Sequence, residues 1–294
     1  MLRDLLRKSG ILVASAVYDA LSARICERAG FELVEVSGYC VSGSFLGMTD
    51  VDLLTMQDMV TVVKNIAGAV SIPVMVDADT GYGNAINAAR AVKEFERAGA
   101  PGIMIEDQVA PKKCPFIGSQ PLISEKEMLG KIRATLDARS SEALIKRART
   151  DARGQEAIER ANSYADAGAE MIHAVQRSVE DVEGFPKLVH APLSIAVMGW
   201  KQSCTVEELK RRGYKAAIFV ASMYSVTKAL VDFMAVVKNT GTVKGLEDKM
   251  VSMEHYEKLV DLSARFSFRV FESKISYELR GAHVIKNAAR AKLC

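Results

Sequence analysis

Eight short apolar runs, rich in β-branched residues, recur along the chain, and amphipathic stretches separate them. Most runs are continuously apolar, which is typical of parallel strands that helices cover on both faces. Two of the intervening stretches, 20–29 and 87–98, have apolar residues three and four positions apart, as helices do. The predicted strands are residues 11–17, 31–37, 72–79, 102–108, 143–150, 170–175, 193–198 and 216–222.

A weak internal repeat supports this alternation, because a glycine recurs where a predicted helix ends just before a strand. These glycines are Gly30, Gly99, Gly168 and Gly213. Glycine at such a position supplies the left-handed conformation that ends many helices. Strand and helix alternating eight times predict a (β/α)8 TIM barrel, and a doubly wound open sheet is the alternative.

The pattern changes after about residue 240, where Gly241 and Gly245 mark a linker. The remainder has no predicted strand and carries a helical apolar stripe. We therefore predict a barrel domain over residues 1–240 and a helical extension over 241–294 that packs on a neighbouring subunit. The stripe consists of Leu259, Leu262, Phe266 and Val270.

Composition excludes several classes of function. The 39 basic and 36 acidic residues are spread along the chain without a basic block, which argues against nucleic-acid binding. No apolar run is long enough to span a membrane, and the first residues lack the apolar core of a signal peptide. The five cysteines are scattered and form no C-x-x-C pair, so we predict a reducing, cytoplasmic location.

Acidic side chains end the third and fourth predicted strands, where the catalytic groups of a barrel lie. Asp77, Asp79 and Glu106 would repel one another at the barrel mouth unless a cation held them ionised. Oxygen ligands without nearby His or Cys favour Mg²⁺, with Mn²⁺ as a second choice. The alternative is that Asp77 and Asp79 cap the following helix and bind loop amides.

Positive charge follows the fourth and fifth predicted strands. Arg149 could grip a substrate carboxylate with two hydrogen bonds, and a salt bridge to a barrel carboxylate is the alternative. Cys114 follows Lys112 and Lys113, whose charges predict a lowered thiol pKa and a role as acid or base. The alternative for Cys114 is an ordinary loop thiol.

Two further positions are ambiguous. The segment Ser37-Gly38-Tyr39 ends the second predicted strand, and its amides could receive a carboxylate or could form only a turn. His173 ends the sixth predicted strand, where an isolated histidine is more often a hydrogen-bonded wall residue than a catalyst.

Four motifs together resemble the isocitrate lyase and phosphoenolpyruvate mutase superfamily, and their order and spacing match as well. The likeness runs from about residue 10 to 240. It implies a Mg²⁺-dependent barrel whose ligands, partly through water, include Asp77, Asp79, Glu106 and also Asp50, which is identified through the resemblance alone. The motifs are Val-Asp-Ala-Asp-Thr-Gly-Tyr-Gly at 76–83, Ile-Glu-Asp-Gln at 105–108, Pro-Lys-Lys-Cys at 111–114 and Ala-Arg-Thr-Asp at 148–151.

The resemblance also implies how substrate is bound. Members of this superfamily stabilise an enolate-like 2-oxo acid on the metal. Residues 37–39 would lie near the substrate carboxylate, and Arg149 would complete its binding site. Many members are tetramers in which C-terminal helices pack onto a neighbour, and residues 246–294 have that character.

The chain departs from the lyases of this superfamily at three places. Pro115-Phe116 follows Cys114, where the lyases have Gly-His. Ala174-Val175-Gln176 lacks the glutamate expected after the sixth strand, and Met198-Gly199-Trp200-Lys201 replaces an Asn-x-Thr-Glu element. The groups that bind a third carboxylate are thereby lost, and Trp200 would supply an apolar wall. His173 resembles the mutase branch, although that branch has asparagine at the position of Cys114.

We therefore predict a Mg²⁺-dependent carbon–carbon lyase that cleaves a small 2-hydroxy dicarboxylate, less polar than methylisocitrate, into a 2-oxo acid and a carboxylate. Cys114 would act as the acid, and Lys112 and Lys113 would close the loop. The first alternative is a decarboxylase, hydrolase or phosphonomutase of a 2-oxo acid such as oxaloacetate or phosphonopyruvate. The second is a non-catalytic barrel subunit.

Overall fold

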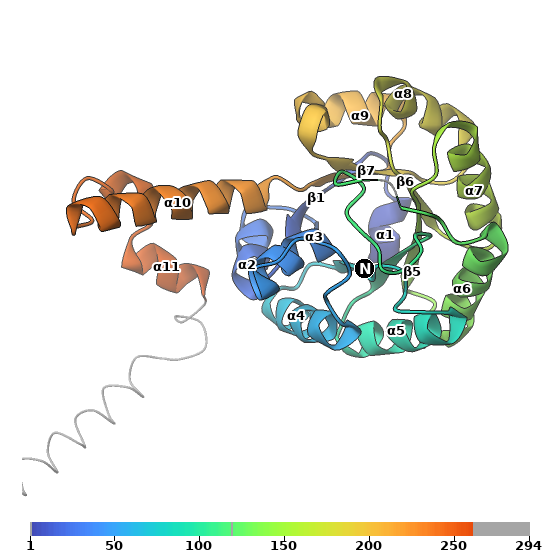
Figure 1. The fold of residues 1–294 in the computed structure, drawn as a ribbon, viewed down its shortest axis with the longest axis horizontal. Helices are drawn as coiled ribbons and strands as arrows, with labels where there is room; N and C mark the ends of the chain where they lie inside the picture. The colour runs from blue at the N-terminus through green and yellow to red at the C-terminus, as the bar shows by residue number, and fades with distance from the viewer. Residues whose placement is uncertain (1, 119, 261–294) are drawn as a thin grey trace, which may run out of the picture. The chain divides into compact units, whose positions relative to one another are not determined.

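The structure, a computed structural model, describes residues 2–118 and 120–260, and eight parallel strands form its centre. Neighbouring strands pair in the order β6-β5-β4-β3-β2-β1-β8-β7. A parallel bridge between Ile172 and Leu193 joins the two ends of the sheet, so the strands form a ring (Figure 1). The predicted (β/α)8 barrel is confirmed, and the open sheet is excluded.

Each strand lies inside its predicted range. The strands are β1 (Leu12–Val17), β2 (Leu33–Val36), β3 (Val74–Asp77), β4 (Gly102–Glu106), β5 (Ile145–Thr150), β6 (Met171–Ala174), β7 (Ser194–Val197) and β8 (Ala216–Phe219).

Helices α2 and α4 to α9 surround the ring, as Figure 1 shows. The longer helices of the described chain are α2 (Ala20–Arg28), α4 (Met56–Ala69), α5 (Ala85–Arg97), α6 (Glu125–Ala138), α7 (Gly154–Asp166), α8 (Val179–Leu188) and α10 (Ser222–Thr240). The shorter ones are α1 (Leu2–Arg7), α3 (Gly38–Val41), η1 (Ser42–Leu46), η2 (Gly199–Ser203), α9 (Val206–Arg212), η3 (Glu247–Lys249) and α11 (Met253–Leu259).

Local chemistry sets where the helices begin and end. Asn84 accepts hydrogen bonds from the backbone amides of Ile86 and Asn87, at 2.9 and 3.4 Å, so α5 begins two residues before the predicted stretch. The four glycines predicted to end helices all have left-handed backbone, with φ between 88° and 102°.

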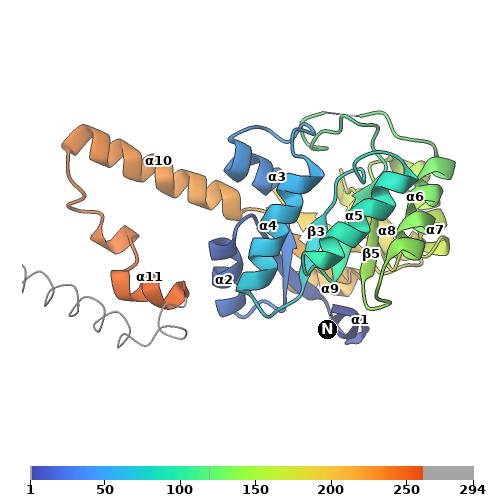
Figure 2. The same ribbon diagram turned by 90° about the horizontal axis from the view of Figure 1, so that it is seen from below.

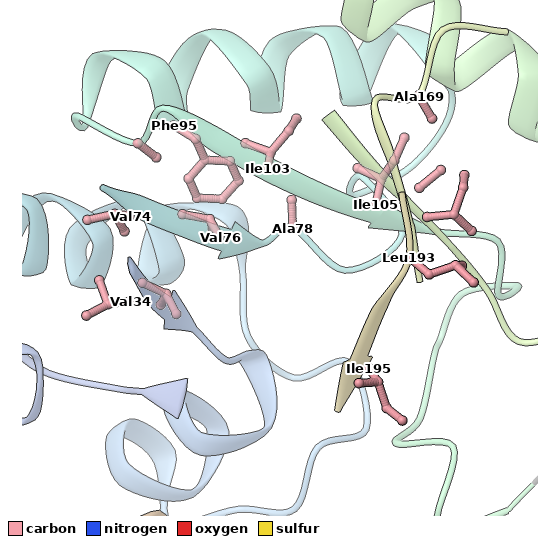
Figure 3. Close-up of a cluster of buried hydrophobic side chains, with 14 of the residues drawn as sticks. Val34, Val74, Val76, Ala78, Phe95, Ile103, Ile105, Ala169, Leu193 and Ile195 are labelled. Carbon is pink, nitrogen blue, oxygen red and sulfur yellow. The ribbon is translucent and has the colours of Figure 1, made fainter. Parts of the chain in front are cut away.

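Two apolar layers hold the barrel together. One lies between the strands and the helices, and Figure 3 shows Phe95 of α5 pointing toward Val76 and Ile103. The other lies inside the barrel, where Leu2 and Leu5 of α1 belong to the same buried cluster as the first residues of several strands. Figure 2 shows α1 at the end of the barrel opposite α3. Since each buried leucine contributes about 1.5–3 kcal/mol, α1 is a stable plug, and ligands must enter at the other end.

The chain divides into two compact units between Asp232 and Phe233, inside α10. The predicted boundary near residue 240 therefore stays a prediction. Of the predicted apolar stripe, Leu259 ends α11, and Leu262, Phe266 and Val270 lie outside the described residues. Within residues 2–118 and 120–260, we find no helix with the length and hydropathy needed to cross a membrane.

Candidate active site

One cavity opens at the carboxyl end of the barrel, and alternate residues of the strands line it. Side chains two residues apart on a strand point to the same face, so they share the barrel interior. The acidic residues Asp50 and Asp77 and the loop residue Cys114 also line this cavity. The alternating pairs are Glu35 and Ser37, Arg147 and Arg149, His173 and Val175, Ala196 and Met198, and Ile218 and Val220.

The structure brings Asp77 and Asp79 together at the end of β3. A Cβ atom on Gly38 would lie 3.1 Å from Asp79 Oδ1 and 3.4 Å from Asp77 Oδ2, so both carboxylates reach the start of α3. Neither of them caps the following helix, because Asn84 does so, but Asp77 Oδ1 does accept a hydrogen bond from a loop amide, that of Asp79, at 3.2 Å. Glu106 ends β4 and is 1% exposed.

Lys112 reaches into this acidic cluster. Its Nζ lies 2.5 Å from Asp50 Oδ1 and 2.7 Å from Asp79 Oδ1. Burial raises the pKa of Asp79 and of Glu106, and neighbouring Asp77 raises both further, while Lys112 opposes the shift. Burial by itself would lower the pKa of Lys112, but the surrounding carboxylates, Asp79 first, raise it. Lys112 therefore remains an ammonium ion.

The cluster has the chemistry of a cation site. Asp50, Asp77, Asp79 and Glu106 are all buried, and Glu106 Oε1 has no hydrogen-bond partner in the described part of the chain. Buried carboxylate oxygens with this excess of negative charge fit a hard divalent cation. In residues 2–118 and 120–260, however, no three Asp, Glu, His or Cys side chains are already placed to coordinate one metal ion. The ammonium group of Lys112 neutralises part of the negative charge.

Arg149 is held by two carboxylates. Its Nε and Nη2 lie 2.9 and 3.1 Å from the two oxygens of Asp151, and its Nη1 lies 2.8 Å from Glu106 Oε2. The salt bridge considered as the alternative is thus present, and Arg149 also lines the cavity. Its binding of a substrate carboxylate stays a prediction.

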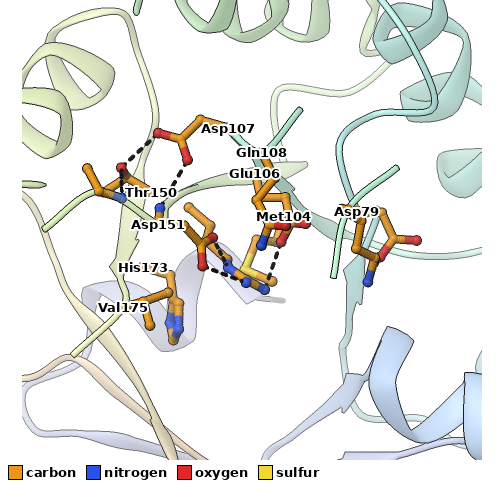
Figure 4. A network of polar contacts seen from close by, with 12 residues as sticks. Asp79, Met104, Glu106, Asp107, Gln108, Thr150, Asp151, His173 and Val175 are labelled. Carbon is orange, nitrogen blue, oxygen red and sulfur yellow. Dashed lines mark hydrogen bonds and ion pairs between the residues drawn. The ribbon is translucent and has the colours of Figure 1, made fainter. Parts of the chain in front are cut away.

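Asp107 anchors the back of the site and was not singled out from the sequence. It follows Glu106 directly, so it points to the opposite side of the strand end. Its carboxylate accepts hydrogen bonds from Thr150 Oγ1 at 2.7 Å, Tyr164 OH at 2.8 Å and the Asp151 amide at 3.0 Å. Figure 4 shows Asp107 joined to Thr150 and Asp151. Asp107 thereby fixes the segment that carries Asp151.

The variant Tyr164→Phe tests this anchor. It removes one donor from a fully buried carboxylate that keeps its other donors, so we expect the free energy of unfolding to fall by about 1 kcal/mol. Catalytic activity should be unchanged, because Tyr164 does not line the cavity. Urea denaturation measures the loss, with the exposed Tyr256→Phe as control. Equal stability of the two variants would contradict the role given to Tyr164.

Charged residues also lie deep in the barrel. Glu35 and Arg147 form a buried ion pair, and burial raises the pKa of Glu35 although Arg147 opposes the shift. His173 Nδ1 lies 3.0 Å from Ser194 Oγ. Burial lowers the pKa of His173, and nearby Arg147 lowers it further, so the ring is neutral at pH 7. His173 is both a hydrogen-bonded wall residue and part of the cavity lining.

The loop after β4 carries Cys114 into the cavity. The Gln108 side chain bonds both the amide and the carbonyl of Lys113, each at 3.0 Å, and the Cys114 amide donates to the Asp50 carbonyl at 3.1 Å. Burial raises the pKa of the Cys114 thiol, so the predicted lowering is wrong. The physical reason is that desolvation outweighs Lys112, whose charge faces Asp50 and Asp79. A thiol that keeps its proton is suited to act as an acid.

The start of α3 holds the segment predicted to meet a carboxylate. Ser37 precedes this helix, and its Oγ accepts a hydrogen bond from the Cys40 amide at 3.4 Å. Tyr39 lines the cavity together with Ser37, and its hydroxyl accepts a hydrogen bond from Tyr224 OH at 3.2 Å. Gly38 lies between them against the two aspartates. The structure therefore brings residues 37–39 to the acidic cluster.

Lys201, in η2 after β7, is a cavity residue to which the sequence assigned no role. It is 1% exposed, its Nζ donates to the Gln176 carbonyl at 3.3 Å, and Nζ lies 5.5 Å from the centre of the Phe116 ring. The signal in the sequence was a lysine three residues after the predicted end of the seventh strand. The side chain of Trp200, predicted to form an apolar wall, lies outside the described part of the structure.

Comparison with known proteins identifies the family to which this chain is similar. The family model for phosphoenolpyruvate phosphomutase matches residues 2–238. The chain is 38% identical to 2,3-dimethylmalate lyase of Eubacterium barkeri over 276 residues, which cover 89% of this chain and 93% of that protein. It is 39% identical to 2-methylisocitrate lyase of Aeropyrum pernix over 268 residues, 88% of this chain and 86% of that protein.

A solved structure of phosphonopyruvate hydrolase in complex with oxalate and Mg²⁺ has the same fold. Its TM-score is 0.84 at 28% sequence identity, and the match covers 92% of this chain and 96% of that one. The family model spans most of the chain, and the two lyases match it along nearly their whole length. The chain therefore belongs to the phosphoenolpyruvate mutase and isocitrate lyase superfamily, as its motifs predicted.

Proposed function

We propose that the protein is a Mg²⁺-dependent lyase that cleaves a small 2-hydroxy dicarboxylate into a 2-oxo acid and a second carboxylate. The observation that carries this proposal is that a buried thiol, Cys114, lines the same cavity as the acidic cluster. The similarity to 2,3-dimethylmalate lyase and 2-methylisocitrate lyase supports it.

Asp50, Asp77, Asp79 and Glu106 would hold the metal, partly through water. A bound divalent cation supplies stabilisation of negative charge on substrate oxygens. Mg²⁺ is the first choice because a protein of the same fold binds it, and Mn²⁺ is the second. Lys112 ties the loop that carries Cys114 to Asp50 and Asp79, so loop closure and the acidic cluster are linked. Lys113 would assist closure through its charge.

The cavity walls account for substrate recognition. The 2-hydroxy acid end of the substrate would lie among residues 37–39, Arg149 and His173. The remaining cavity wall is apolar and includes Val175, Met198 and Val220. An apolar wall suits alkyl groups of the substrate rather than a third carboxylate.

In the proposed reaction, the proton of the C2 hydroxyl passes to a carboxylate of the acidic cluster, and C2 becomes the carbonyl carbon of the 2-oxo acid. The C2–C3 bond breaks, and its electron pair moves to C3 and into the carboxylate attached there. Cys114 then donates its thiol proton to C3. The acidic cluster returns a proton to the thiolate through water, which restores the enzyme.

Turnover of a panel of compounds tests the proposal. We expect Mg²⁺-dependent release of a 2-oxo acid from alkyl-substituted 2-hydroxy dicarboxylates, detected by coupled reduction, and loss of release with a chelator. Activity confined to oxaloacetate or phosphonopyruvate would favour the alternative, a decarboxylase, hydrolase or mutase of a 2-oxo acid. Two observations support that alternative: the histidine at position 173, and the similarity in fold to phosphonopyruvate hydrolase. Absence of both turnover and calorimetric Mg²⁺ binding would favour a non-catalytic subunit.

We propose further that the protein is a cytoplasmic homotetramer in which residues 241–294 pack on a neighbour. The exposed apolar side chains of α10, such as Leu230 at 53% and Val231 at 59%, support association. The scattered free cysteines Cys26, Cys40 and Cys204 are consistent with a reducing compartment. Light scattering of the full chain would measure the number of subunits.

A further inference from the structure

We propose that Lys201 binds the distal carboxylate of the substrate, the one attached to the carbon that Cys114 protonates. The inference rests on the proposed function and deepens it, because it assigns to one residue the choice of a dicarboxylate over a monocarboxylate. Lys201 would then be a residue that determines specificity and also stabilises the transition state.

The first argument is position. Lys201 lines the same cavity as Cys114, and its ammonium group lies over the ring of Phe116, two residues beyond Cys114 in the same loop. The contact places a positive charge beside the segment that carries the general acid. A carboxylate held by Lys201 would therefore have its neighbouring carbon near the Cys114 thiol.

The second argument is the division of the cavity. Strands β2 to β5 contribute Glu35, Asp77 and two arginines to the lining. Both arginines are held in ion pairs, Arg147 with Glu35 and Arg149 with Glu106, which lies behind the lining. Strands β6 to β8 contribute mainly apolar lining residues, and on this side the lining includes Lys201, whose Nζ also donates to the Gln176 carbonyl. One ammonium group among apolar walls fits one carboxylate that carries alkyl groups. The apolar lining residues here are Val175, Ala196, Met198, Ile218 and Val220.

The third argument is charge. Burial, and then Arg177, lowers the pKa of Lys201 to about 8, while the neighbouring Cys204 and Asp181 oppose the shift. A bound carboxylate stabilises the charged ammonium, so binding and protonation favour each other. When the C2–C3 electron pair moves into the distal carboxylate, that group gains negative charge. The interaction with Lys201 is then stronger in the transition state than in the ground state.

Lys201→Met tests the inference because methionine keeps the length of the side chain and removes its charge. Two probes separate the two ends of the site by calorimetry with saturating Mg²⁺. Oxalate reports the metal and 2-oxo acid end, and propionate, an alkyl monocarboxylate added with saturating pyruvate, reports the distal carboxylate. We expect Lys201→Met to weaken propionate binding by about 10- to 100-fold, as loss of a charged hydrogen bond does, and to change oxalate binding less than twofold.

Two further variants complete the experiment. Lys201→Arg keeps the charge and should retain propionate binding within about tenfold of the wild type, whereas the exposed Lys187→Met should match the wild type with both probes. On the substrate that the wild type cleaves, Lys201→Met should raise KM and lower kcat together.

Unchanged propionate binding in Lys201→Met, with oxalate binding intact, would overturn the role of Lys201 and leave the proposed function standing. Failure of the wild type to bind either probe would overturn both. If Lys201→Met loses oxalate binding as well, Lys201→Arg decides: propionate binding retained supports the inference, and propionate binding lost while oxalate still binds overturns it.

Discussion

Replacing Cys114 with alanine is expected to lower kcat by about 10²- to 10⁴-fold, the usual contribution of a positioned general acid. The thiol is buried, lines the cavity and keeps its proton because burial raises its pKa. Without the thiol, no proton donor is in place for the electron pair on C3. A water molecule would have to enter the cavity past the loop and supply the proton instead. Coupled reduction of the released 2-oxo acid measures the loss.

Substrate binding should survive this change, since the groups expected to bind the 2-hydroxy acid end come from other elements. Oxalate affinity in Cys114→Ala should therefore equal that of the wild type. Cys26→Ala removes a second buried thiol, one that lies in α2 away from the cavity, and should leave kcat unchanged. Full activity of Cys114→Ala would exclude the lyase mechanism and favour chemistry on a 2-oxo acid, where enolate formation needs no thiol.

The strands and the acidic cluster could be predicted because their signals are local. A continuous apolar run indicates a buried parallel strand, and a carboxylate at its end indicates the barrel mouth. Asp77, Asp79 and Glu106 follow this rule, and all three are buried at the mouth. The glycines at the helix ends follow a similarly local rule.

The remaining features depend on pairs that lie far apart in the sequence. In the sequence, Glu35 only interrupts an apolar strand. Its role becomes clear in the structure, where it forms an ion pair with Arg147 of another strand. The pKa of Cys114 was predicted from its neighbours in sequence, Lys112 and Lys113, but its burial and the two aspartates that face Lys112 decide the outcome. Lys201 lines the cavity from η2, a short helix after β7 that the sequence did not predict.

Asp77→Asn should abolish the stabilisation of the protein by Mg²⁺ and change its thermal stability little in the absence of metal. Asp77 lies beside Asp79, and its charge raises the pKa of both Asp79 and Glu106, so it destabilises their ionised forms. The same charge stabilises the charged forms of Lys112 and Arg149. An isosteric amide removes the repulsion and the attraction together, so the two effects offset one another. The same change removes a charged oxygen from the set expected to hold the cation, and without the cation the substrate oxygens lose their main source of stabilisation.

The comparison with and without metal makes the test specific, because a variant that merely damages the fold would already be less stable without metal. At a Mg²⁺ concentration about one hundred times Kd, the wild type should gain about 2.7 kcal/mol, and Asp77→Asn should gain almost nothing. Asp137→Asn, an exposed acid on α6, should behave as the wild type does. Equal stabilisation of Asp77→Asn and wild type by Mg²⁺ would show that Asp77 does not hold the cation. If Asp77→Asn nevertheless lost turnover, the cause would have to be altered positioning of the substrate.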